Sequence, residues 1–159
     1  MMSDYPLAPA IDASEWFNTP APLSLESLRG EVVVLHAFQM LCPGCVMHGL
    51  PQAQAMHERL GPLGVRVIGL HSVFEHHEAM TAVALRAFIH EYRLSFPIAI
   101  DRPSAQHPIP HTMAAYGFQG TPSLVVIDRQ GRIREQAFGQ VNDLLLGVLI
   151  GQLLTEPKV

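Results

Sequence analysis

The chain of 159 residues has neither an excess of basic charge nor a long apolar run. It carries 10 lysine and arginine residues against 14 aspartate and glutamate residues, a formal net charge of −4 at pH 7. Nucleic acid and anionic membrane surfaces require a positive field, so neither is an expected partner. The apolar stretches 32–41 and 144–154 reach only about half of the roughly 20 residues that a membrane-spanning helix needs.

A secretory signal is not visible at the N-terminus either. Residues 1–6 carry no basic side chain, and Pro6 and Pro9 interrupt any apolar region that could follow. The reducing cytoplasm is therefore the expected compartment, or the periplasm if a signal peptide has been removed. With 48% hydrophobic residues, residues 1–159 are long enough to form a single domain without disulfides for stability. Within that domain we expect an N-terminal extension (1–30) and a core (31–155).

Cysteine is equally scarce, because Cys42 and Cys45 are the only two in the chain. They form the segment Cys-Pro-Gly-Cys shortly after the apolar run Val32–Phe38. In a reducing compartment such a pair is more often catalytic or metal-binding than structural. At the start of a helix, two thiols at this spacing can close a disulfide ring, while free backbone N–H groups favour the first as thiolate. A dithiol redox site is the leading hypothesis.

The rest of the sequence alternates between strand and helix patterns. Val32–Phe38 is β-branched-rich and typical of a strand buried on both faces. Further strands are predicted over 64–71, 96–100, 123–127 and 133–138, and helices over 45–60, 78–92, 112–116 and 143–154. Pro51 should kink the first of these helices. The order predicts an α/β fold with a central mixed β-sheet, helices on both faces, and the cysteines at the carboxyl end of the first core strand.

Several motifs fit one family when they are taken together. They are the segments 25–35, 42–45, 96–101 and 116–133, with Pro51 in the helix after the cysteines. Jointly they resemble the thioredoxin fold, and within it the TlpA/ResA-like thiol-disulfide oxidoreductases, which are close to the AhpC/TSA redoxins. The resemblance covers roughly residues 20–155. It implies a thioredoxin-like fold, disulfide-containing protein or small thiol substrates, an electron-donating reductase as partner, and no cofactor or metal beyond the redox-active Cys42–Cys45 disulfide.

The resemblance also assigns roles to individual residues. Cys42 should be the attacking thiolate, and Cys45 should resolve the mixed disulfide. Pro122 matches a cis-proline that lies beside the cysteines in this family, and the backbone of Thr121 would pair with an incoming peptide. A cis bond is physically reasonable there, because X-Pro is the one linkage at which it costs little. The alternative is an ordinary trans proline at the start of a strand.

Three positions depart from the family pattern. Leu41 stands where a tryptophan is usual, which removes an aromatic side chain from the surface that faces the partner. His36 replaces an aspartate or asparagine and could accept the proton of Cys45; the alternative is a core histidine bonded to a backbone carbonyl. Glu75 lies about one residue from an active-site glutamate of ResA-like proteins and could shuttle protons. The alternative is that Glu75 is an ordinary charged residue of a solvated loop.

A peroxiredoxin-like peroxidase is the first rival function, because peroxiredoxins share the fold. Their motif requires Pro-x-x-x-Thr/Ser-x-x-Cys, but Gln39 stands three residues before Cys42. The expected hydroxyl is therefore missing.

A non-enzymatic Cu/Zn-binding carrier is the second rival. Cys42, Cys45 and His48 lie on successive turns of the predicted helix, and thiolates with imidazoles suit both metals. Further histidines are His71, His76, His77, His107 and His111. A closed zinc site commonly uses two ligand pairs, and the sequence supplies one.

Overall fold

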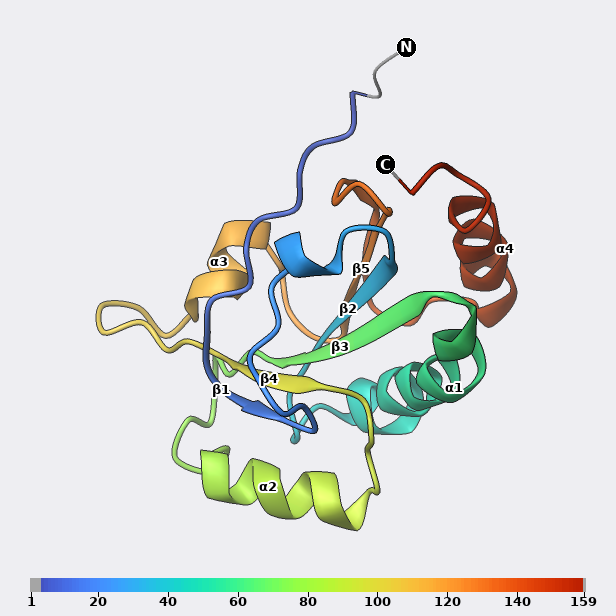
Figure 1. The fold of residues 1–159 in the computed structure, drawn as a ribbon. Helices are drawn as coiled ribbons and strands as arrows, with labels where there is room; N and C mark the ends of the chain where they lie inside the picture. Colours follow the sequence, from blue (N-terminus) through green and yellow to red (C-terminus); the bar gives the residue numbers. More distant parts are fainter. Residues whose placement is uncertain (1–3, 159) are drawn as a thin grey trace.

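A six-stranded mixed sheet forms the centre of the protein (Figure 1). The computed structural model describes residues 4–158. Residues 1–3 belong to the segment in which a signal peptide was not expected, and they lie outside the described residues. The strands are β1 (Ala13–Phe17), β2 (Val32–Phe38), β3 (Val65–His71), β4 (Ile98–Asp101), β5 (Ser123–Ile127) and β6 (Ile133–Phe138). Their order is β1-β4-β3-β2-β5-β6. Strands β2, β3 and β4 are parallel, whereas β1, β5 and β6 join antiparallel. The predicted mixed sheet is confirmed.

Helices cover both faces of this sheet (Figure 1). They are η1 (Glu26–Leu28), η2 (Cys45–Gly49), α1 (Leu50–Leu60), η3 (Gly61–Leu63), α2 (Ala82–Glu91), α3 (His111–Tyr116) and α4 (Asp143–Leu153). Buried side chains of α1, α2 and α4 form one core cluster, and those of α3 and η1 belong to a second cluster across the sheet. Each helix among residues 4–158 is too short or too polar to span a bilayer.

Strand β2 positions the cysteines because it lies in the interior of the sheet. All seven of its residues are buried, as the continuous apolar run predicts. It pairs with β3 on one side and with β5 on the other. The chain that leaves its carboxyl end therefore emerges between the loops that follow β3 and precede β5.

The N-terminal segment 1–30 contributes more to the fold than the sequence predicted. No strand was expected there, yet β1 pairs with β4 and forms one edge of the sheet. The sequence pattern of β1 is weak because Phe17 is the only buried residue of the five in this strand. Pairing with β4, about 80 residues further along the chain, defines this strand, and such long-range pairing leaves no local pattern.

The helix after the cysteines changes type at Pro51. Residues Cys45–Gly49 form a π-helical turn, and α1 then begins at Leu50 with Pro51 in its first turn. Proline has no N–H to donate to the preceding turn, so a regular α-helix cannot run through it unchanged. A π-helical turn that begins at Cys45 thus precedes Pro51, while the predicted kink at Pro51 stays a prediction.

Helix α2 begins later than predicted. The apolar spacing predicted a helix over 78–92, but α2 starts at Ala82. Thr81 caps it, since the Thr81 side chain accepts a hydrogen bond from the N–H of Ala84 at 3.2 Å. The cap is a stronger start signal than the apolar spacing before it.

Candidate active site

Cys42 lies at the N-terminus of the helix that follows β2. The helical backbone starts at Pro43, and the carbonyl of Cys42 accepts from the N–H of Val46 at 3.1 Å. Its Sγ accepts from the N–H of Cys45 at 3.3 Å, as an N-capping side chain would. The predicted juxtaposition of this sulfur with the N–H groups at the start of the helix is present.

The two thiols differ strongly in burial. Cys42 is partly exposed, whereas Cys45 has no exposed surface. Burial raises the pKa of Cys45 to about 12, and its hydrogen bond with Cys42 adds to this. Cys45 is therefore protonated at neutral pH, so a base must take its proton before its sulfur can attack.

The loop before β5 lies against the dithiol. The Thr121–Pro122 peptide bond is cis, as the resemblance implies. The thiol of Cys42 donates a hydrogen bond to the carbonyl of Thr121 at 3.4 Å. A Cβ at Gly44 would lie 3.4 Å from Cδ of Pro122, so the loop packs directly on the segment between the cysteines. The fold thus brings Cys42, Cys45, Thr121 and Pro122 together.

His36 is buried beneath the π-helical turn. It is 1% exposed, and neither ring nitrogen has a hydrogen-bond partner among the described residues. The backbone-carbonyl bond of a purely structural histidine is thus not formed. Burial lowers the pKa of His36 to about 4, so the ring is neutral at pH 7. Its ring lies against Gly49, four residues after Cys45.

Gly49 makes room for this imidazole, which gives a testable expectation. A Cβ at residue 49 would lie 2.5 Å from Cε1 of His36 and 2.7 Å from its Nε2. Gly49→Ala should therefore lower the free energy of unfolding by about 1–3 kcal/mol, measured by urea denaturation.

The same substitution is also made in a His36→Ala variant, in which the added methyl group of residue 49 has no imidazole ring to clash with. A double-mutant cycle should give a coupling energy on the order of 1 kcal/mol or more. Additive effects of the two substitutions would contradict the contact.

Glu75 is not brought into the dithiol environment by any interaction among the described residues. Its side chain is exposed and makes no hydrogen bond or ion pair with another of them. The preceding residue, Phe74, is anchored, because its N–H donates to Oε1 of Gln39 at 3.2 Å. The backbone of this loop is therefore tied to the site, while a role for the Glu75 carboxylate stays a prediction.

Sequence reasoning missed Gln39 as a component of this site. Gln39 is 2% exposed, and its side chain connects two loops: Oε1 accepts from Phe74, and Nε2 donates to Oγ1 of Thr121 at 3.5 Å. A hydrogen bond with the backbone of Gln39 also lowers the pKa of Cys45, against the larger effect of burial. A polar residue directly after an all-apolar strand was the available signal.

A second buried imidazole, His71, also escaped assignment to the site. Its Nε2 accepts from the N–H of Met40 at 3.3 Å, and burial lowers its pKa to about 4. His71 therefore holds the chain between β2 and Cys42 from the side of β3. The available signal was a histidine that ends the predicted strand 64–71.

The metal-carrier alternative gains no support from side-chain placement. Within residues 4–158, no group of three or more histidine, cysteine, aspartate or glutamate side chains is arranged to hold a metal ion. His48, the third ligand considered from the sequence, is exposed on η2, whereas Cys45 points into the core.

The strand order, the cysteines at the helix start and the cis-proline together define a thioredoxin-like redox fold. Two solved structures support this class at high similarity. A crystal structure of a thioredoxin-like superfamily protein is 52% identical, with a TM-score of 0.92 over 95% of this chain and 97% of that one. A thiol-disulfide isomerase from Corynebacterium glutamicum is 53% identical, with a TM-score of 0.91 over 97% and 99% of the two chains.

The chain belongs to the AhpC/TSA family, whose model matches residues 8–136. Among characterised relatives, Protein DipZ of Mycobacterium bovis is 28% identical over 145 residues, covering 90% of this chain but 20% of DipZ. The thiol-disulfide oxidoreductase ResA of Bacillus thuringiensis is 27% identical over 128 residues, which cover 80% of this chain and 66% of ResA. The chain thus spans about a fifth of DipZ and about two thirds of ResA.

Proposed function

We propose that this protein is a thiol-disulfide oxidoreductase that reduces disulfides through Cys42 and Cys45. One observation carries the proposal: the partly exposed sulfur of Cys42 lies at a helix N-terminus, 3.4 Å from the carbonyl that precedes the cis-proline. Substrate sulfur can reach Cys42 but not the buried Cys45. Relatives named as a thiol-disulfide isomerase and as thiol-disulfide oxidoreductases support the same chemistry.

The reaction consists of two thiol-disulfide exchanges. The Cys42 thiolate attacks one sulfur of the substrate disulfide, so that a mixed disulfide forms and the other substrate sulfur leaves as a thiolate that takes up a proton. The Cys45 thiolate then attacks the Sγ of Cys42 and releases the second substrate thiol. Two electrons pass to the substrate, and the protein is left with a Cys42–Cys45 disulfide. An external dithiol, supplied by a reductase, must reduce this disulfide again.

Thr121 and Pro122 would form the substrate-binding edge of this site. The carbonyl of Thr121 accepts from the Cys42 thiol in the resting state. When Cys42 becomes a thiolate it no longer donates, and the backbone of Thr121 is then free to pair with an extended substrate segment. Leu41, 58% exposed beside Cys42, presents an aliphatic surface to that segment in place of the usual tryptophan.

His36 is the proposed acceptor for the proton of Cys45. It is neutral at physiological pH and has a free nitrogen, and its ring lies under the helix one turn beyond Cys45. A neutral imidazole here would assist the second exchange and not the first.

His36→Asn tests this role. Attack of Cys42 on the substrate should keep its rate, while resolution by Cys45 should slow by about one to two orders of magnitude. Acid-quenched time courses analysed by mass spectrometry would show the mixed disulfide accumulating. The exposed His90→Asn is the matched control, and equal slowing of both steps in His36→Asn would contradict a specific role.

The direction of electron flow follows from the reduction potential. A titration of the Cys42/Cys45 pair against glutathione is expected to give a value below about −180 mV, as for a reductase. A value well above this would indicate an oxidase or isomerase instead. Rapid peroxide turnover that is lost in Cys42→Ser would favour the peroxidase alternative. Metal bound stoichiometrically to untagged protein would favour the carrier.

Partners, cofactors and compartment complete the proposal. We propose disulfide-containing proteins or small disulfides as substrates, a separate electron-donating reductase, and no cofactor apart from the cysteine pair. The reducing cytoplasm stays a prediction from cysteine usage. Alkylation trapping in intact cells checks it, since the pair should be recovered mainly as dithiol there.

A further inference from the structure

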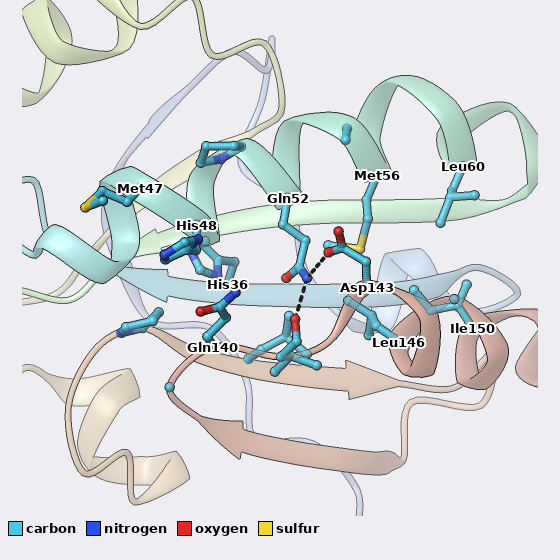
Figure 2. Close-up of a pocket in the computed structure, with 18 of the residues that line it drawn as sticks. His36, Met47, His48, Gln52, Met56, Leu60, Gln140, Asp143, Leu146 and Ile150 are labelled. Carbon is cyan, nitrogen blue, oxygen red and sulfur yellow. Dashed lines mark hydrogen bonds between the residues drawn. The ribbon is translucent and has the colours of Figure 1, made fainter.

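A groove of about 500 Å³ runs between α1 and α4 (Figure 2). Pro122 is one of its lining residues. Its walls are mostly apolar, with Met56 and Leu60 of α1 facing Leu146 and Ile150 of α4. Its volume lies in the range of sites that bind small molecules. The proposed dithiol chemistry involves its lining residues His36 and Pro122 but not its apolar walls.

The inner end of the groove contains an unsatisfied polar group. His36 lines the groove there, and both of its ring nitrogens lack a partner among the described residues. A buried polar group without a hydrogen bond is destabilising, so a molecule that displaces the atoms covering the ring and supplies such a bond gains binding energy. A neutral imidazole offers one donor and one acceptor, which suits a hydroxyl, carbonyl or amine group at the buried end of a ligand.

The outer end of the groove contains a free cation. Arg59 lines it, is exposed, and forms no ion pair with another described residue. The acidic residue of the groove, Asp143, is not paired with this arginine; its Oδ1 accepts from Nε2 of Gln52, another lining residue, at 2.6 Å (Figure 2). Guanidinium pairs readily with carboxylate or sulfonate.

We propose that this groove binds a small amphiphilic acid. The apolar body lies between Met56, Leu146 and Ile150, the acid group pairs with Arg59, and a polar group reaches toward His36. Neither cysteine lines the groove, although His36, the proposed proton acceptor for Cys45, does. A ligand there would nevertheless touch Pro122 and Gly49.

Fluorescence titration with 8-anilinonaphthalene-1-sulfonate, an aryl sulfonate, tests the proposal, with decanoate as competitor. We expect one probe per chain, displaced by decanoate. Gly147→Leu should weaken binding at least tenfold, because residue 147 lines the groove and has open space in which a side chain can extend over it. Gly151→Leu is the matched control: it lies one turn further along α4, also in open space, and does not line the groove. Both changes favour helix formation, so neither should prevent folding.

The charge is tested separately. Arg59→Gln should weaken probe binding about two- to fivefold, in keeping with a solvent-accessible ion pair. Arg93→Gln, which removes a distant arginine, should leave it unchanged. The Cys42→Ser/Cys45→Ser double variant should bind as the unmodified chain does, so a failure of the oxidoreductase proposal would not affect this result.

Three outcomes would overturn the proposal. The first is saturable probe binding whose affinity is unchanged by Gly147→Leu. The second is probe binding that is lost in Val148→Asp but kept in Gly147→Leu, which would place the probe on the exposed outer face of α4. The third is release of the probe as the protein concentration rises, together with dimer formation in analytical ultracentrifugation. That result would show that a second copy of the chain occupies the groove.

Discussion

Cys42→Ser is expected to reduce disulfide reductase activity on the order of a thousandfold or more. Cys42 is partly exposed at a helix N-terminus, whereas the Cys45 thiol has no exposed surface and a pKa raised to about 12 by burial. Cys45 cannot replace it as the first nucleophile. Insulin reduction with dithiothreitol as electron donor measures the loss.

Cys45→Ser is the matched variant for this experiment. It should keep the first exchange and arrest at the mixed disulfide, which non-reducing electrophoresis detects as a covalent adduct with the substrate. Adduct formation by Cys42→Ser, but not by Cys45→Ser, would reverse the proposed roles of the two cysteines.

Acidification from pH 6.5 to pH 4 should remove a large part of the stability of the fold. Burial lowers the pKa of both His36 and His71 from 6.5 to about 4. Between these values the unfolded chain binds protons that the native state does not, so the free energy of unfolding falls as pH falls. The stabilisation is complete above pH 6.5, and each histidine loses up to about 3 kcal/mol by pH 4.

Carboxyl groups modify this profile. Burial raises the pKa of Asp101, whose native form therefore gains protons earlier on acidification and offsets part of the loss. Asp128 is held below its ordinary pKa mainly by hydrogen bonds from Arg132, Gln130 and Arg134, which outweigh its own desolvation. Its contribution is lost only at still lower pH.

Urea denaturation at pH 7.5, 5.5 and 4.5 measures the dependence. His36→Leu should remove about half of the loss between pH 6.5 and 4, because one of the two buried imidazoles is gone. His90→Leu, at an exposed histidine, should leave the slope unchanged. A denaturation midpoint that is constant from pH 7.5 to 4.5 would contradict the buried, neutral state of both rings.

The sequence predicted the dithiol end of the site well because its signals are local. Cys42 and Cys45 are adjacent in the chain, and the apolar β2 run places them at the carboxyl end of a central strand. Their contact with Thr121 could not be deduced from spacing, since 79 residues separate the two partners. Only the resemblance to a known family indicated it.

The sequence did not predict the polar groups around the dithiol. Gln39 connects residues 74 and 121, and His71 contacts the segment before Cys42 from the neighbouring strand. Such contacts depend on which loops meet at the sheet edge, and local propensity carries no information about that. Glu75 was linked to the site only by the resemblance to ResA-like proteins, and its side chain is exposed.

By itself, the sequence determined the order of the elements from β2 onward and the place of the cysteine pair, because apolar periodicity and motif spacing are properties of neighbouring residues. Tertiary structure decided the rest. Pairing with β4 added β1 to the sheet, the thiol of Cys45 was buried within the π-helical turn and His36 beneath it, and a groove was left between α1 and α4. Burial and long-range pairing depend on contacts between distant segments, and these exist only once the chain has folded.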